Sequence, residues 1–194
     1  MNLEDRLNQQ FAAHIESVSE SAFYLSAPLV RASEVMVEGL LQGSKIISCG
    51  NGGSASVAQH FTAKMLNRYQ RERPGLPALA LTGAGTTLTA ISDAHGFEQV
   101  FAKQLEALGQ PGDVLLAIST GGGCENIARG IQAARERQLR IILLSGGESP
   151  LGEMLREQDV EIRVPSADSA RIQEIHLLAI HCLCDLIDTC LLGG

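Results

Sequence analysis

The sequence predicts one α/β domain, built on a parallel sheet with helices on both sides. From residue 45 onward, apolar segments alternate with segments of helical periodicity. Two of the apolar segments, residues 114–118 and 141–144, contain no polar side chain, which is typical of parallel strands buried on both faces. A chain of 194 residues is long enough for one such domain with a full core, and short for two. We therefore expect a doubly wound fold in a single domain spanning residues 1–194.

The first 43 residues are expected to form a pair of helices that precedes an αβα core of residues 44–194. Apolar side chains recur there at helical spacing: Leu3, Leu7, Phe11, Ile15 and Val18. Pro28 is expected to start the second helix, and Gly43 to follow its end. The apolar stripes of this helical hairpin need a partner, which is either the domain itself or another subunit.

Five strands and the helices between them are expected in the rest of the chain. The strands are predicted at residues 45–49, 77–81, 114–118, 140–144 and 159–164. The helices are predicted at residues 55–67, 86–92, 97–108, 124–137 and 149–157, with a last helix from about 168 to 192. The second half of the last helix is apolar almost all round, which predicts burial on more than one side and points to a subunit interface.

A glycine turn follows the first predicted strand. Asn51, Gly52 and Gly53 make the turn, Ser54 stands where a helix N-cap belongs, and a helix is expected from Ala55. Strand, glycine turn and helix start form a layout that binds phosphate through free N–H groups and the helix dipole. The spacing matches neither a P-loop nor the dinucleotide fingerprint. A tight βα turn with an ordinary N-cap is the alternative.

A second glycine turn follows the third predicted strand and again opens a helix. Ser119 and Thr120 offer hydroxyl groups, Gly121 allows close approach of the backbone, and Cys124 stands at the helix start. Two such turns at the carboxyl ends of parallel strands face the same crevice, which is where open α/β sheets bind ligands. The pattern predicts a pocket for an anion or a sugar phosphate.

Charge and cysteine content narrow the possible partners and the compartment. The net charge is −7, so direct contact with nucleic acid is not expected, because the chain has no basic stripe to displace counterions. Five cysteines without metal-binding spacing suggest reduced thiols in the cytoplasm. We also expect no signal peptide and no membrane span.

Six stretches of the chain share motifs with a known family: residues 49–54, 59–61, 73–78, 112–120, 159–165 and 170–176. On these stretches the chain resembles the sugar isomerase (SIS) domain family, and most closely its phosphoheptose isomerase branch. The resemblance implies a three-layer αβα fold with a five-stranded parallel sheet, and a homotetramer with pockets at the subunit interfaces. It also implies proton transfer between adjacent carbons of sedoheptulose 7-phosphate, in the synthesis of lipopolysaccharide heptose.

The resemblance assigns roles to individual residues. The zinc ligands of the family fall on His60, Gln173 and His181. The sugar-phosphate pocket falls on the two turns and on residues beyond them: Asn51, Gly52, Gly53, Ser54, Asp93, Ser119, Thr120, Gly121, Cys124 and Gln173.

The chain departs from the family pattern at the metal site and in the phosphate turn. The Glu that binds metal and acts in catalysis falls on Lys64, one helical turn after His60. A lysine is ordinarily cationic at neutral pH, so it repels a divalent metal and accepts no proton. Two serines of the phosphate turn are Gly121 and Cys124. We therefore expect no cofactor, no metal and no catalytic residue, and we expect His60 to form a hydrogen bond across the cleft instead.

The missing Glu is shared with one branch of the family, the DnaA initiator-associating (DiaA) proteins, which are tetramers that bind the replication initiator DnaA. The chain resembles that branch in residues 65–69, 102–109 and 181–188. We therefore expect a non-catalytic protein that promotes DnaA assembly at the chromosomal origin. Two alternatives stay open: a phosphoheptose isomerase, which would be an aldose–ketose isomerase using zinc, or a sensor that only binds a sugar phosphate.

Overall fold

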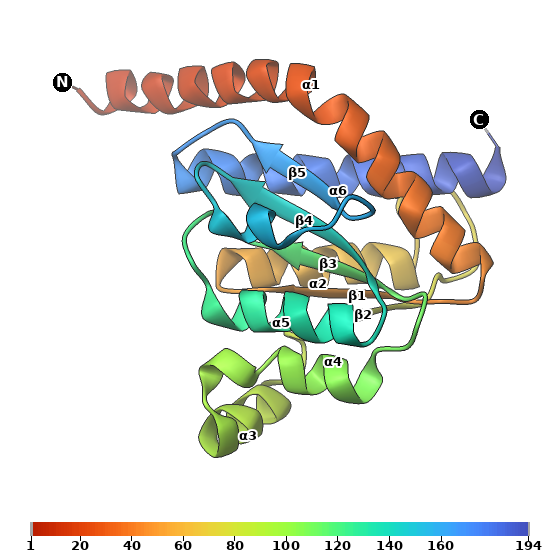
Figure 1. The fold of residues 1–194 in the computed structure, drawn as a ribbon. Helices are drawn as coiled ribbons and strands as arrows, with labels where there is room; N and C mark the ends of the chain where they lie inside the picture. Colours follow the sequence, from red (N-terminus) through yellow and green to blue (C-terminus); the bar gives the residue numbers. More distant parts are fainter. Residues whose placement is uncertain (1, 194) are drawn as a thin grey trace.

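The computed structural model describes residues 2–193 and confirms the predicted fold class (Figure 1). One sheet of five parallel strands has the order β2-β1-β3-β4-β5. The strands are β1 (Ile46–Gly50), β2 (Ala78–Ala80), β3 (Val114–Ile118), β4 (Arg140–Gly146) and β5 (Val160–Val164). Each lies within two residues of its predicted position, and β3, a fully buried run without polar side chains, matches its prediction residue for residue.

Helices cover both faces of the sheet, as the three-layer arrangement requires. One face carries α1 (Leu3–Leu41), α2 (Gly53–Leu66) and α6 (Ser169–Leu192). The other carries α3 (Gly85–His95), η1 (Phe97–Gln99), α4 (Ala102–Leu108), α5 (Glu125–Glu136) and η2 (Pro150–Met154). Successive strand residues point to opposite faces, so Ile46 and Leu116 join the core under α2 and α6, whereas Ile47 and Leu115 join the core under α4 and α5.

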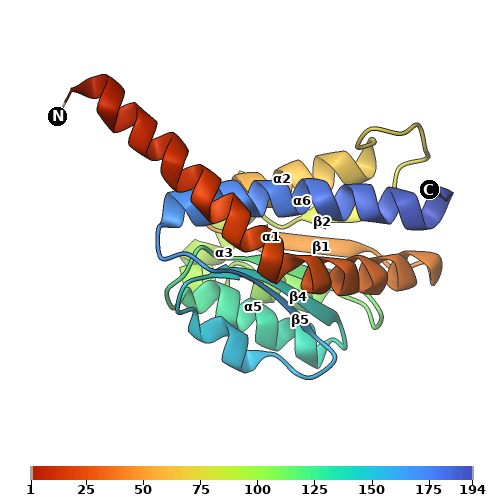
Figure 2. The same cartoon turned by 90° about the horizontal axis from the view of Figure 1, so that it is seen from above.

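The predicted N-terminal helical hairpin is wrong: α1 is one continuous helix of 39 residues, with Pro28 inside it. Figures 1 and 2 show the helix bending, so that its first half projects past the sheet and its second half lies along the domain. A proline inside a helix removes one hydrogen bond and costs about 3 kcal/mol. Leu25 lies before the proline and Leu29 after it, and both pack against the same core. This shared burial outweighs the penalty, so the helix bends at Pro28 and does not end there.

Two other predicted helices differ from expectation. Residues 149–157 form only the short 3₁₀ helix η2. Residues 86–92 and 97–108 become α3, η1 and α4, and the break between α3 and η1 falls at Gly96, whose φ is +90°. A positive φ is open to glycine at little cost and interrupts the helix there.

The last helix, α6, belongs to the core. By length and composition alone it could cross a membrane. It contacts α1, α2 and β4, and Ile180, Leu183 and Ile187 are fully buried. An apolar core helix passes the same test of length and hydropathy.

Candidate functional site

The first glycine turn is set by the way α2 begins. The strand β1 ends at Gly50, Gly52 adopts a φ of +53° as the N-cap, and α2 starts at Gly53 without a side-chain cap. Ser54 is therefore not the N-cap that the sequence predicted: it lies in the first turn of α2 and is buried. A Cβ atom at Gly50 would lie 2.7 Å from the backbone of Ser54, so the close fit of strand and helix requires glycine at that position. The N–H groups of Ser54 and Ala55 already donate to the carbonyls of Asn51 and Gly52, so it is the N–H groups before them, at the N-cap and the first helical residue, that this helix start offers to an anion.

The second glycine turn has the same construction. Gly121 and Gly122 have φ values of +133° and +75°, and Cys124 is the N-cap of α5 without a side-chain hydrogen bond to the helix. The Ser119 hydroxyl donates to the carbonyl of Gly121 at 3.3 Å and lies 3.8 Å from the Cys124 sulfur. This turn therefore also presents an uncapped helix start, with a hydroxyl beside it.

Strand register and one pair of side chains bring the two turns together. The last residues of β1 and β3, Gly50 and Ile118, are paired in the sheet. Beyond them, the side-chain amides of Asn51 and Asn126 form two reciprocal hydrogen bonds of 2.8 Å. Asn126 was not among the predicted site residues, although an amide at the start of α5 was the signal that could have identified it.

A cavity of about 520 Å³ lies between α2 and α6. Its lining combines imidazole, amide, carboxylate and apolar side chains: Ser56, Val57, His60, Ala170, Gln173, Glu174, Leu177 and His181. The amide of Gln173 lies directly against Gly53, where a Cβ atom would come within 2.0 Å of its nitrogen. Gln173 thus connects the cavity to the first glycine turn.

Two histidines face each other in this cavity. His60 on α2 and His181 on α6 have their Nε2 atoms 2.9 Å apart. A hydrogen bond between two ring nitrogens needs one donor and one acceptor, so at least one ring is neutral. Partial burial, followed by the charges of His181 and Lys64, lowers the pKa of His60. The lowered pKa keeps the His60 ring neutral at pH 7, which is the protonation state that a proton acceptor needs.

Tyr69 packs against one ring of the histidine pair. Its ring stacks on His181 with centroids 5.6 Å apart and an interplanar angle of 28°. Desolvation, then the nearby Asp185, raises the pKa of the Tyr69 hydroxyl, so the ring presents a neutral phenol to His181. Tyr69 was not among the predicted site residues, because it lies in the loop after α2 and no periodicity links it to α6.

The donor set around these histidines fits a zinc ion poorly. Zinc sites in proteins usually include an anionic ligand or three imidazoles. Within residues 2–193 there is no group of three or more His, Cys, Asp and Glu side chains placed to hold a metal. The cavity supplies His60, His181 and the neutral amide of Gln173, and Lys64 adds a positive charge near His60.

The end of α2 that carries Lys64 is fixed by a buried ion pair. Arg73 Nε donates to Asp188 Oδ1 at 2.5 Å, and both side chains are almost fully buried. The same guanidinium donates to the carbonyls of Lys64 and Met65 at 3.1 and 2.9 Å. Arg73 therefore satisfies carbonyl groups at the C-terminus of α2 and joins them to α6.

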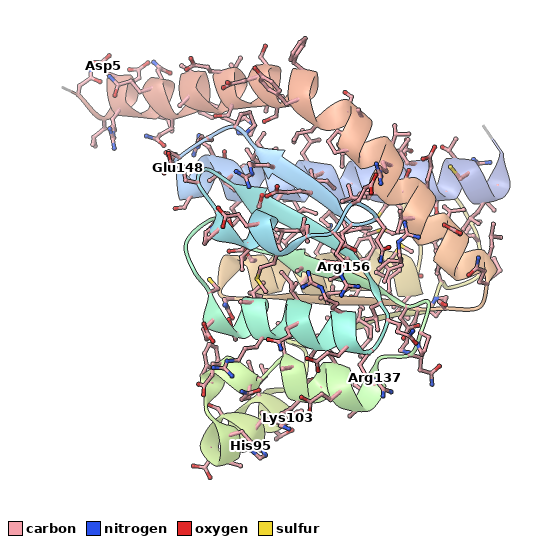
Figure 3. The ribbon with its side chains drawn as sticks, viewed as in Figure 1. Asp5, His95, Lys103, Arg137, Glu148 and Arg156 are labelled. Carbon is pink, nitrogen blue, oxygen red and sulfur yellow. The ribbon has the colours of Figure 1, made fainter. Side chains whose placement is uncertain are left out.

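Asp93 is not brought to the other predicted residues. It lies exposed on α3, and no hydrogen bond or ion pair of its carboxylate is found among residues 2–193. Figure 3 shows His95, at the end of the same helix, on the side of the sheet opposite α6.

Comparisons with known proteins identify the relatives of this chain. The profile of the SIS domain matches residues 8–146. A phosphoheptose isomerase of Azoarcus sp. (strain BH72) is 50% identical over 194 residues, covering 100% of this chain and 98% of the relative. The structure of phosphoheptose isomerase GmhA from Neisseria gonorrhoeae superposes with a TM-score of 0.92 at 43% identity, over 97% of this chain and 100% of that one. A phosphoheptose isomerase from Francisella tularensis gives a TM-score of 0.95 at 45% identity, over 97% and 100%.

These relatives overturn the expectation of a DnaA-binding protein of replication initiation. Proteins that match the whole chain at about half identity are named phosphoheptose isomerase, and nothing in the comparisons points to DnaA as a partner. The expectation rested on one side chain, Lys64 in place of a catalytic glutamate. Other side chains that reach the substrate can supply the proton acceptor instead. The conditional expectation, that an enzyme of this sequence would be an aldose–ketose isomerase, agrees with the relatives.

Proposed function

The chain belongs to the SIS domain family, and on that basis we propose that it is a phosphoheptose isomerase acting on sedoheptulose 7-phosphate. The observation that carries the proposal is identity of 49–50% along the whole chain to proteins of that name. The cavity between α2 and α6 supports it, because it combines a proton-accepting histidine pair with a neighbouring glycine turn.

The reaction needs two proton movements. One proton passes from C1 to C2 of the sugar, and one passes from the oxygen on C1 to the oxygen on C2, through an enediol. We assign the carbon-bound proton to the neutral imidazole of the His60–His181 pair, which takes it from C1 and returns it to C2. Tyr69 keeps the His181 ring in place by stacking. The ammonium group of Lys64 places positive charge near the site, and such a charge stabilises a developing enediolate oxygen.

The phosphate group is assigned to the two glycine turns. Their helices begin without side-chain caps, and a dianion at two helix starts gains hydrogen bonds and favourable dipole interactions. The hydroxyls of Ser54, Ser119 and Thr120 complete this part of the proposed pocket. The carbon chain of the sugar then extends past Gln173 toward the histidines, since Gln173 contacts Gly53 and also lines the cavity.

The cytoplasm is the compartment that fits this proposal. All five cysteines are free thiols, and Cys49 and Cys184 are buried. Proteins of oxidising compartments commonly pair their cysteines.

The test is direct turnover. The purified protein is incubated with sedoheptulose 7-phosphate in deuterated buffer, with and without added zinc, and NMR follows the aldose product and the deuterium that enters the carbons. We expect turnover without zinc, and a loss of about 10²- to 10⁴-fold in His181→Gln. His95→Gln, on exposed α3, is the matched control and should keep full activity.

Each other outcome has a defined meaning. No turnover in either condition contradicts the proposal. A rise in melting temperature with the sugar phosphate, without turnover, would instead identify a sensor. Turnover only with zinc would keep the function and reject the metal-free assignment of the proton transfer.

A further inference from the structure

The two glycine turns are joined by a single side-chain link. Asn51 follows β1, and Asn126 lies in the first turn of α5 after β3. Asn51 Nδ2 donates to Asn126 Oδ1 at 2.8 Å, and Asn126 Nδ2 donates to Asn51 Oδ1 at 2.8 Å. Among residues 2–193, no other side-chain hydrogen bond connects one turn to the other.

Burial makes the Asn51–Asn126 amide pair rigid. Asn126 is 4% exposed, so water does not compete for its amide. Each amide uses one N–H and its oxygen in the pair and keeps one further N–H. Asn51 is only partly buried, so its remaining N–H belongs to the open side of the turn, while Asn126 is fixed in the interior. The orientation of the Asn51 amide is therefore set by Asn126.

The backbone on both sides needs such a link. Strand pairing between β1 and β3 ends at Gly50 and Ile118. The first turn continues with Gly52 and Gly53, and the second with three consecutive glycines, residues 121–123. Glycine has the largest conformational freedom of all residues, so the backbone of the two turns does not by itself fix the distance between them. A reciprocal amide pair across the gap fixes that separation.

We propose that Asn126 is a positioning residue for phosphate binding: by pairing with Asn51 it sets the spacing and orientation of the two glycine turns that hold the phosphate of the substrate. This inference rests on the proposed function, because it deepens the assignment of the phosphate to those turns. Asn126 itself does not touch the ligand in this arrangement, since its amide faces Asn51 and its side chain is buried.

The test separates binding from chemistry. Asn126→Leu keeps the approximate size of the side chain and removes the amide, which frees Asn51. We expect KM for sedoheptulose 7-phosphate and the inhibition constant of inorganic phosphate to rise together by about tenfold, the equivalent of one good hydrogen bond, with a smaller change in kcat. Gln132→Leu, on the exposed face of the same helix, is the matched control and should leave both constants unchanged.

A second variant gives a pH signature that a general loss of stability does not give. In Asn126→Asp, an ionised carboxylate accepts from Asn51 but donates nothing, and it repels phosphate. When protonated, it both donates and accepts and so restores the pair. Burial of residue 126 raises the pKa of a carboxyl group there above its ordinary value of about 3.9, so the ratio of the inhibition constant of the variant to that of the wild type should fall as the pH is lowered from 7 to about 4.5. The wild type and Gln132→Leu set the baseline.

The outcomes distinguish this inference from the proposed function. If folded Asn126→Leu binds phosphate and substrate as tightly as the wild type, the positioning role is rejected and the function stands. A constant ratio in Asn126→Asp across the pH range rejects it as well, including when the leucine variant does not fold. If the wild type neither binds phosphate nor turns over the sugar, the proposed function fails first.

Discussion

Acid should destabilise this protein through one buried histidine. His176 on α6 is fully buried and its Nε2–H donates to the carbonyl of Ser145 at 3.0 Å, while its Nδ1 is buried with no hydrogen-bond partner among residues 2–193. Burial lowers the pKa of His176 from 6.5 to about 4. Protonation would place a buried N–H and a positive charge on Nδ1, and the described part of the chain offers no acceptor for them. The ring is therefore neutral in the folded protein at pH 7.

The size of the effect follows from the shift. The folded pKa lies below the unfolded value, so the unfolded chain binds more protons between pH 6.5 and pH 4. The contribution of His176 to stability is complete above pH 6.5 and declines as the pH falls through that window. At about 1.4 kcal/mol for each pH unit, the full loss is about 3 kcal/mol.

Urea unfolding at pH 7, 5.5 and 4, at one fixed protein concentration, measures this loss. His176→Gln cannot titrate, so its free energy of unfolding should fall by about 3 kcal/mol less than that of the wild type between pH 7 and pH 4. His95→Gln, on exposed α3, should keep the wild-type pH dependence. If His176→Gln and the wild type lose the same amount, the buried imidazole is not the source of acid sensitivity and the reasoning fails.

Three further substitutions test the site and its support. Lys64→Glu exchanges the cation beside the histidine pair for an anionic ligand. The amount of zinc bound per chain, measured after dialysis, should rise above the wild-type value, and an unchanged value would show that this charge does not decide metal binding. Gly53→Ala drives a methyl group into the amide of Gln173, and KM for the sugar phosphate should rise by about tenfold or more at nearly constant melting temperature. Asp188→Leu removes the carboxylate partner of the buried Arg73 guanidinium and should lower the free energy of unfolding by about 3–5 kcal/mol. The double variant Arg73→Met/Asp188→Leu should lose less than the two single variants together, and additive losses would contradict the coupling.

Much of the fold could be predicted because its strands are buried on both faces. The segment 114–118 matches β3 residue for residue, and the last helix begins within a residue of the predicted start, where Asp168 caps it through hydrogen bonds to the backbone. The N-terminal hairpin was wrong for a specific reason. A proline is read locally as a helix start, but the core contact of Leu25 and Leu29 is a tertiary effect that local sequence does not contain.

The site could be predicted only where a local sequence pattern indicated it. Glycine turns after apolar strands marked both helix starts. The contacts that join segments far apart in the chain were not predictable in this way: Asn51 with Asn126, Tyr69 with His181, and Gln173 with Gly53. They depend on the strand register and on the path of α6 across α2, which arise from the packing of the whole domain.

Lys64 shows why one substitution does not exclude the proposed function. A proton transfer needs a base of suitable pKa within hydrogen-bond reach, and the identity of that base is secondary. The loss of a glutamate at residue 64 removes one candidate base, but His60 and His181 lie 2.9 Å apart at the wall of the same cavity. The positive charge beside them lowers the pKa of His60, after burial and His181, and so keeps that imidazole in its proton-accepting form. In the proposed reaction, Lys64 therefore favours a different proton acceptor, and turnover without zinc tests this assignment directly.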